Sequence, residues 1–116
     1  RSVSASAPTC APTEVPWGRK AFSGYLGEDR SAWSGHDAAQ LIASGARVPP
    51  LLVDQGLAGQ FLETQLRPER LEAACAAAGQ PLELRRHAGY DHGYFFVATF
   101  VGEHVEHHAR TLCAPP

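Results

Sequence analysis

The segment Ala88-Gly89-Tyr90-Asp91-His92-Gly93 contains the residue type best suited to acid–base chemistry, a histidine in a loop with glycine and aspartate. The loop follows a strand-like run at 82–84 and precedes a long aromatic-rich helical pattern. An imidazole held between a strand end and a helix start can serve as a general base, because its unperturbed pKa lies near neutrality. Most loop histidines have no such role, so the spacing alone leaves an ordinary histidine at a helix start as the alternative.

A second candidate, Asp54, directly follows the apolar run Leu51-Leu52-Val53 and precedes Gln55-Gly56. A short continuous apolar run is typical of a buried parallel strand. Acids at the carboxyl ends of such strands are frequent active-site residues in α/β sheets. Asp54 and His92 therefore follow two different strands and are expected at the same edge of one sheet.

Three further histidines, His104, His107 and His108, lie on the last helical pattern beside acidic residues. The four-residue spacing of His104 and His108 can chelate a metal from one helix face. The alternative is a solvated face whose imidazoles lie favourably near the helix C-terminus. Because the sequence indicates no third ligand elsewhere, we predict no metal site.

The elements that position these residues alternate between strand and helix patterns. In chain order we predict a strand at 2–7, a long loop at 9–35, a helix at 37–44, a strand at 51–53, helical turns at 60–66, a helix at 68–78, a strand at 81–86 and a final helix at 95–109. Strands separated by helices favour a parallel sheet with right-handed crossovers. The predicted fold class is therefore α/β, with about three parallel strands and flanking helices.

Two of these segments have unusual composition. The small side chains of the first strand suit a buried strand between two layers, whose further partners would have to come from an upstream half. The loop at 9–35 contains Trp17, Phe22, Tyr25 and Trp33, and loops of this length are uncommon unless functional. Its aromatics either wall a pocket or form a satellite hydrophobic cluster, and the sequence favours neither.

The two longer helices each show an apolar face. In the helix at 68–78 this face contains Leu71, Ala74, Cys75 and Ala78, and Gly79 caps the end. In the final helix the apolar stripe contains Phe95, Ala98, Val101 and Val105.

Composition narrows the possible functions. The chain has 116 residues, 44% of them hydrophobic, and a formal net charge of -2, which fits one globular domain or a piece of one. There is no charge excess of the kind that binds nucleic acid or anionic membranes, no apolar run of bilayer length, and no signal-peptide pattern at the start. We therefore expect a soluble cytoplasmic protein. Cys10, Cys75 and Cys113 are too widely spaced to indicate a disulfide framework or a zinc site, and Cys75 is expected in the core.

Several motifs distributed over the whole chain resemble one known family, the S-formylglutathione hydrolases, which are serine thioesterases of the α/β-hydrolase fold. The motifs are Ser2-Val3-Ser4-Ala5, Pro16-Trp17-Gly18, Lys20-Ala21-Phe22-Ser23-Gly24-Tyr25-Leu26-Gly27, Asp54-Gln55-Gly56, Gln60-Phe61-Leu62, Tyr90-Asp91-His92, Phe96-Val97-Ala98-Thr99-Phe100 and His107-His108-Ala109. The resemblance implies that residues 1–116 form the C-terminal portion of a single α/β-hydrolase domain. It also implies that His92 is the base of a Ser-Asp-His triad.

The sequence departs from the family at the other two triad positions. None of its serines lies in a Gly-x-Ser-x-Gly elbow, so the N-terminal half with the nucleophile is expected to be absent. The position of the family's triad aspartate falls on Gly59, and a glycine cannot orient an imidazole. Asp54 or Asp91 could substitute weakly, although the resemblance assigns this role to neither.

The resemblance further implies a reaction and its participants. S-formylglutathione, a small-molecule thioester, would be hydrolysed to glutathione and formate in formaldehyde detoxification, with no cofactor and no metal. We expect Trp17 to wall the substrate pocket, and relatives of this family are often homodimers. Three interpretations remain open: a fragment that is inactive alone, a degenerate non-catalytic binding module, and one complementing half of a split hydrolase.

Overall fold

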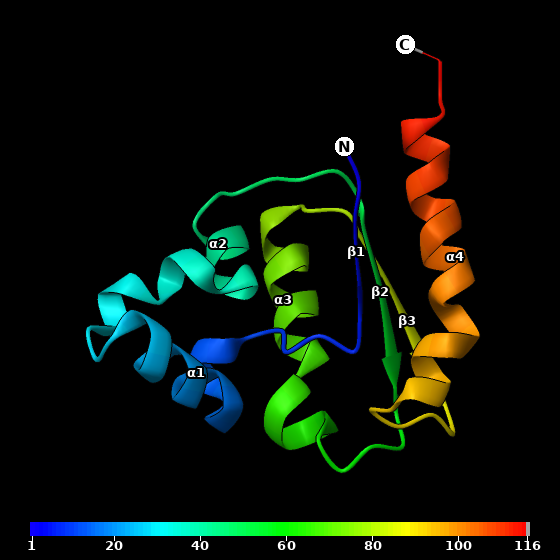
Figure 1. The fold of residues 1–116 in the computed structure, drawn as a ribbon. Helices are drawn as coiled ribbons and strands as arrows, with labels where there is room; N and C mark the ends of the chain where they lie inside the picture. The colour runs from blue at the N-terminus through cyan, green and yellow to red at the C-terminus, as the bar shows by residue number, and fades with distance from the viewer. Residues whose placement is uncertain (116) are drawn as a thin grey trace.

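One parallel sheet, with strand order β1-β2-β3, organises the computed structural model, which describes residues 1–115. The strands are β1 (Val3–Ser6), β2 (Leu51–Gly56) and β3 (Leu82–His87). Val3 pairs with Leu51, and Leu51 in turn pairs with Leu82. The predicted α/β class with three parallel strands is confirmed, and all three carboxyl ends lie at the same edge (Figure 1).

The central strand is β2, and every one of its residues is buried. The first strand, by contrast, lies at an edge of the sheet and is only partly buried. Among the described residues 1–115, β1 has a strand neighbour on one side only, so the further partners expected for it are not among these residues. Its small residues remain compatible with close packing, because Ala5 lies against the core.

The helices cover the sheet unequally: α1 (Pro16–Leu26), α2 (Ala38–Ala43) and α3 (Pro68–Ala78) lie on one side, and α4 (Tyr94–Leu112) lies on the other (Figure 1). Between β2 and the helices α2 and α3 is the hydrophobic core. Its buried members are Cys10, Ile42, Leu51, Val53, Leu71 and Cys75.

The helix α3 has the boundaries that its sequence predicts. Pro68 occupies a first-turn position, where its missing N–H costs nothing, and Gly79 ends the helix in the left-handed region with φ of 71°. A short π-helical segment, η4 (Leu62–Leu66), precedes it. The core position predicted for Cys75 is confirmed, since this residue is 2% exposed.

The segment predicted as a long loop at 9–35 instead contains α1 and three short 3-10 helices, η1 (Pro12–Glu14), η2 (Arg30–Ala32) and η3 (Ser34–His36). Two glycines and a proline gave α1 a poor helix propensity. Pro16 nevertheless fits the first helical position, and Gly18 is needed for packing, because a Cβ there would overlap the carbonyl of Pro12. Tertiary contact thus outweighs local propensity.

The orientation of α4 also differs from the prediction. Its buried residues are Phe96 and His104, whereas the expected core stripe is largely exposed, with Phe95 at 76%, Val101 at 47% and Val105 at 63%. The helix therefore contacts the sheet through aromatic and histidine side chains and turns an apolar stripe outward. Within residues 1–115, no helix combines the length and apolarity that crossing a bilayer requires.

Candidate active site

His92 lies in the loop that joins β3 to α4, at the carboxyl edge of the sheet. The loop turns at Gly89, whose φ of 82° suits glycine, and ends at Gly93, the N-cap of α4. The side chain of His92 is exposed and borders a cavity of about 330 Å³ between the end of β1 and the start of α4. The residues lining this cavity are Ser6, Ala7, His92, Gly93, Tyr94, Phe96 and Val97.

Two aromatic rings flank His92. Trp17, from the first turn of α1, has its ring centroid 5.9 Å from that of His92, and Phe61, from the turn before η4, lies at 6.1 Å. The Trp17 and Phe61 rings also contact each other, with centroids 4.6 Å apart. The backbone N–H of Trp17 donates to Oε1 of Gln65 at 2.8 Å, which fixes the start of α1 against the same turn. The structure thus brings Trp17 and His92 together from distant parts of the chain.

Gly59 lies next to the backbone of His92. A Cβ at this position would come within 3.3 Å of the backbone nitrogen of His92, so a side chain here would lie directly beside the histidine loop. A second cavity, of about 260 Å³, occupies this space. Its lining residues are Ala58, Gly59, Gln60, Phe61, Asp91 and His92. Among residues 1–115, no side chain hydrogen-bonds to the His92 imidazole.

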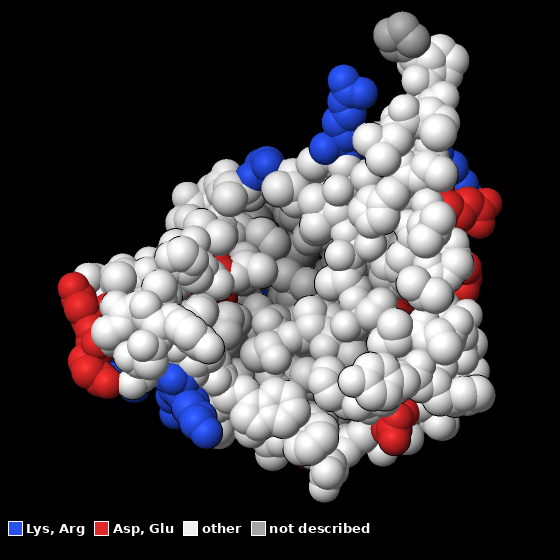
Figure 2. All heavy atoms as spheres, in the orientation of Figure 1, with Lys and Arg blue, Asp and Glu red and all other residues white. Residues whose placement is uncertain are grey.

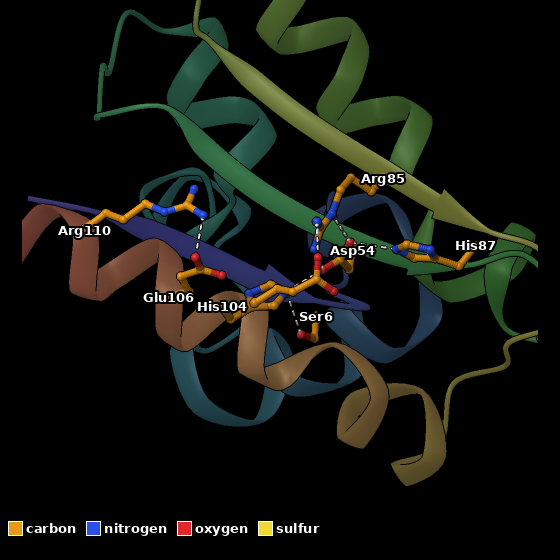
Figure 3. Close-up of polar contacts among 8 residues, drawn as sticks. Ser6, Asp54, Arg85, His87, His104, Glu106 and Arg110 are labelled. Carbon is orange, nitrogen blue, oxygen red and sulfur yellow. Dashed lines mark hydrogen bonds and ion pairs between the residues drawn. The ribbon is translucent and has the colours of Figure 1, made fainter.

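Asp54 is engaged elsewhere, at the centre of a buried polar group drawn in Figure 3. Its carboxylate is fully buried and accepts two hydrogen bonds from Arg85, through Nε at 2.7 Å and Nη2 at 2.6 Å. It also accepts from Nε2 of His87 at 2.8 Å and from Nε2 of His104 at 2.7 Å. We call Asp54, Arg85, His87 and His104 the Asp54 cluster.

The hydrogen bonds decide the charge of Asp54. Burial alone raises the pKa of a carboxyl group, but the bonds from Arg85, His87 and His104 outweigh burial and lower the pKa of Asp54 to about 2. The pKa of Arg85 is raised in turn, first by Asp54 and further by Glu103, which accepts from Nη1 at 2.8 Å. Asp54 is therefore ionised at neutral pH, and neither of its oxygens contacts His92.

Ser6, His104 and Asp54 resemble a catalytic triad in composition, but their geometry is different. Ser6 Oγ lies 3.4 Å from Nε2 of His104, the same nitrogen that contacts Asp54 at 2.7 Å. A triad uses the two imidazole nitrogens separately, one for the serine and one for the acid. Nε2 must carry a proton to donate to the Asp54 carboxylate, so it cannot also accept the Ser6 proton.

The histidines of α4 have separate partners. His108 lies between two serines of the first strand segment, with Nδ1 2.7 Å from Ser2 Oγ and Nε2 2.9 Å from Ser4 Oγ. His107 Nε2 lies 3.2 Å from the carbonyl oxygen of Val3. His104 and His108 thus tie α4 to the sheet. Within residues 1–115, no group of three or more His, Cys, Asp or Glu side chains is arranged to hold a metal ion.

Comparison with known proteins gives this geometry a family context. Residues 1–107 match the family model described as a putative esterase. The chain belongs to this esterase family. It is also similar in structure to a solved S-formylglutathione hydrolase from Agrobacterium tumefaciens, with 46% sequence identity and a TM-score of 0.89. That match covers 94% of this chain and 39% of the other, so the esterase chain described here spans well under half the length of its relative. Its fold is that of an α/β-hydrolase fragment.

The esterase sequence gives no direct signal for the roles of several residues around His92 and Asp54. Phe61 belongs to the motif Gln60-Phe61-Leu62, which assigns it no contact with His92, whereas Arg85 lies in the predicted strand at 81–86 and His87 follows that strand. A signal did exist for the Asp54 cluster: residues 54 and 85 pair across neighbouring strands, and His87 lies two residues further along the same face. The contact with His104 depends on which face of α4 packs on the sheet. The apolar pattern predicts that the face with Phe95, Val101 and Val105 is buried, whereas His104 lies on the face that is buried in the structure.

Proposed function

We propose that this esterase chain supplies the histidine base of an S-formylglutathione hydrolase, which converts S-formylglutathione to glutathione and formate. The observation that carries the proposal is the placement of His92 at the carboxyl edge of the sheet, with the ring of Trp17 and the backbone of Gly59 close to it. The 46% identity to a hydrolase of that name supports the substrate class. Under this proposal residues 1–116 are the C-terminal portion of one α/β-hydrolase domain.

The proposed reaction uses His92 twice. A serine hydroxyl from the remainder of the domain attacks the thioester carbonyl carbon while His92 removes the hydroxyl proton. The carbon–sulfur bond then breaks, and His92 returns the proton to the departing glutathione sulfur. Water, activated by the same imidazole, releases formate from the formyl-serine. Backbone N–H groups of the remainder would stabilise the negatively charged oxygen.

Trp17 and Phe61 fit a wall of the acyl or glutathione pocket, because their rings flank His92 without hydrogen-bonding to it. The proposal requires no organic cofactor and no metal, since acid–base and covalent catalysis account for each step. A cytoplasmic location, a role in formaldehyde detoxification and a homodimeric intact enzyme belong to the same proposal.

Gly59 limits what this chain can do unaided. An acid at that position would lie beside the His92 loop, and the observed glycine provides none. In a serine protease, loss of the orienting acid lowers kcat by about four powers of ten. Asp54 does not replace the acid, because both of its oxygens are already bound within the Asp54 cluster. We therefore propose that the chain alone is inactive or nearly so.

A second candidate function is that of a complementing half that assembles with a separate polypeptide. The outer face of α4 favours it: Tyr94, Val97, Val101 and Val105 form an exposed apolar stripe. The neighbouring strand β1 also has an unpaired edge among the described residues. Uncharged atoms dominate this side of the molecule, with charged side chains mainly at its periphery (Figure 2).

Hydrolysis of S-formylglutathione and of a short-chain aryl ester by the purified chain tests these functions. The assay compares the unmodified chain with His92→Ala, each with and without a polypeptide that contains the serine-elbow half of a related hydrolase. Turnover only in the mixture, lost in His92→Ala, supports a complementing half with His92 as base. Turnover by the chain alone would contradict its proposed inactivity, and turnover that survives His92→Ala would exclude His92 as the base.

A further inference from the structure

His87 connects the Asp54 cluster to the loop that carries His92. It is the last residue of β3, and its side chain is 19% exposed. Its Nε2 lies 2.8 Å from Oδ1 of Asp54. Because an ionised carboxylate only accepts hydrogen bonds, Nε2 must carry a proton, which fixes the orientation of the ring. One edge of the His87 imidazole is therefore held by a buried charge.

The faces of the same ring contact aromatic side chains. His87 stacks on Phe100 of α4, with ring centroids 3.8 Å apart and planes inclined by 23°. Its centroid is 6.0 Å from that of Phe96 and 6.2 Å from that of Tyr90, which meets it at 80°. Tyr90 itself packs against Phe100 at 5.2 Å and against Phe95 at 5.7 Å. The ring of Tyr90 therefore packs against His87, Phe95 and Phe100.

Tyr90 is the side chain that anchors the histidine loop. Within the described loop 88–92, Tyr90 is partly buried and the other residues are exposed. Its carbonyl oxygen accepts a hydrogen bond from the N–H of Ala58 at 2.9 Å. The carbonyl of Tyr90 also lies so close to Gly56 that a Cβ there would overlap it. The position of Tyr90 thus determines where His92, two residues later, meets the Gly59 turn.

We propose that His87 is a positioning residue for His92. The buried carboxylate of Asp54 orients the imidazole of His87, and the ring of Tyr90 packs against that imidazole. Tyr90 in turn sets the conformation of the exposed loop that carries His92. The proposal concerns the same site as the proposed hydrolase function, and its catalytic consequence rests on that function. The mechanical link between residues 87 and 92 is independent of turnover. A purely structural His87 would stabilise the sheet without affecting His92.

The test separates the polar contact of His87 from its bulk. His87→Leu replaces the imidazole by an apolar side chain of similar size and removes the donor to Asp54, whereas His87→Gln retains a donor. The control, His36→Gln, changes an exposed histidine that packs near Phe22, away from the site. The measurement is the chemical shift and line width of the NMR signal of the His92 Cε1–H group in the purified chain at fixed pH.

We expect His87→Leu to shift or broaden the His92 signal by more than His36→Gln does. We expect His87→Gln to restore the signal to that of the unmodified chain. An unchanged His92 signal in a folded His87→Leu variant would overturn the proposal. Failure of His87→Gln to restore the signal would overturn the assigned role of the Asp54 contact.

If His87→Leu does not fold, Tyr90→Leu tests the same link from the loop side, because it leaves the Asp54–His87 contact intact. The same displacement of the His92 signal is expected, and its absence would overturn the proposal. Where the hydrolysis assay gives turnover, His87→Leu should lower kcat by about 10- to 100-fold with KM unchanged. The NMR measurement does not depend on turnover. An absence of hydrolysis would therefore contradict the proposed function and leave the test of the His87–His92 link unaffected.

Discussion

The Asp54 cluster and the His92 loop both border α4, yet their polar groups have very different surroundings. The Asp54 carboxylate is fully buried and accepts four hydrogen bonds, two from Arg85 and one each from His87 and His104. His92 is exposed, is flanked by aromatic rings, and has no hydrogen-bonding side chain among residues 1–115. Histidines thus occur in both regions, but among the described residues their rings are hydrogen-bonded to a side chain in only one of them.

This contrast distinguishes histidines that are placed for folding from one that is placed for chemistry. The imidazoles of His87 and His104 donate through Nε2 to the same buried carboxylate, so they contribute to folding. A bond to a carboxylate does not by itself make an imidazole a poor base, because a triad histidine donates one N–H to its acid and acts through its other nitrogen. His92 differs because its imidazole borders a cavity, where a ring nitrogen can reach a substrate or nucleophile.

The largest expected effect follows from removing the centre of the Asp54 cluster. Asp54→Ala leaves the Arg85 guanidinium without its buried counter-ion and leaves both imidazole donors unpaired. We expect the free energy of unfolding to fall by about 3 to 5 kcal/mol, measured by urea denaturation with circular dichroism. Glu103→Gln removes an exposed partner of the same Arg85 and should cost less than about 1 kcal/mol. An equal loss of unfolding free energy in the two variants would show that the buried position of Asp54 does not make its ion pair more stabilising than the exposed one.

A new carboxylate at Gly59 should give His92 the partner that it lacks. Gly59→Asp places a carboxylate beside the loop that carries His92, where it can accept a hydrogen bond from the imidazole. We expect the ring N–H signal of His92 to show a hydrogen bond that the unmodified chain lacks, followed by ¹⁵N NMR at fixed pH. The closest contact of the new Cβ is at 3.3 Å, so the loop must yield slightly. Gly59→Asn makes the same steric demand without the charge, and an equal change of the His92 ring signal in that variant would show that the carboxylate charge is not the cause.

Acid titration should affect the Asp54 cluster in a defined pH window. The pKa of Asp54 is lowered from 3.8 to about 2 in the folded chain, so its ionised form stabilises the fold fully above about pH 4. This contribution, about 2 kcal/mol, is lost as the pH falls from about 4 to 2. NMR titration of the Asp54 carboxyl carbon, beside urea unfolding at each pH, measures both quantities. A midpoint near 4 would contradict the proposed strength of the hydrogen bonds.

The sequence predicted the sheet better than it predicted the surroundings of the site. Apolar runs and helix caps are local signals, and they located β2, α3 and the His92 loop close to their observed positions. The family motifs added His92, Gly59 and Trp17, and the structure places all three around one loop. Whether these residues bind and convert a thioester remains a prediction.

What the sequence missed depends on tertiary contacts. The helix α1 begins at Pro16 and contains Gly18, so its propensity is low until packing against Pro12 is included. In α4, residues 96, 100, 104 and 108 recur every fourth position and face the sheet, although two of them are histidines. A hydrophobicity pattern assigns such a face to solvent, because it cannot include the buried carboxylate that partners the histidines.

The smallest effect on stability is expected from removing the imidazole of His92. His92→Ala removes an exposed imidazole with no hydrogen-bonding partner among the described residues, so we expect the free energy of unfolding to change by less than about 0.5 kcal/mol. Urea denaturation under the conditions used for Asp54→Ala provides the measurement. A loss above about 2 kcal/mol would mean that contacts with Trp17 and Phe61 make His92 a structural residue. A negligible loss of stability, together with loss of any turnover that the complemented chain shows, would instead establish that His92 is maintained for chemistry.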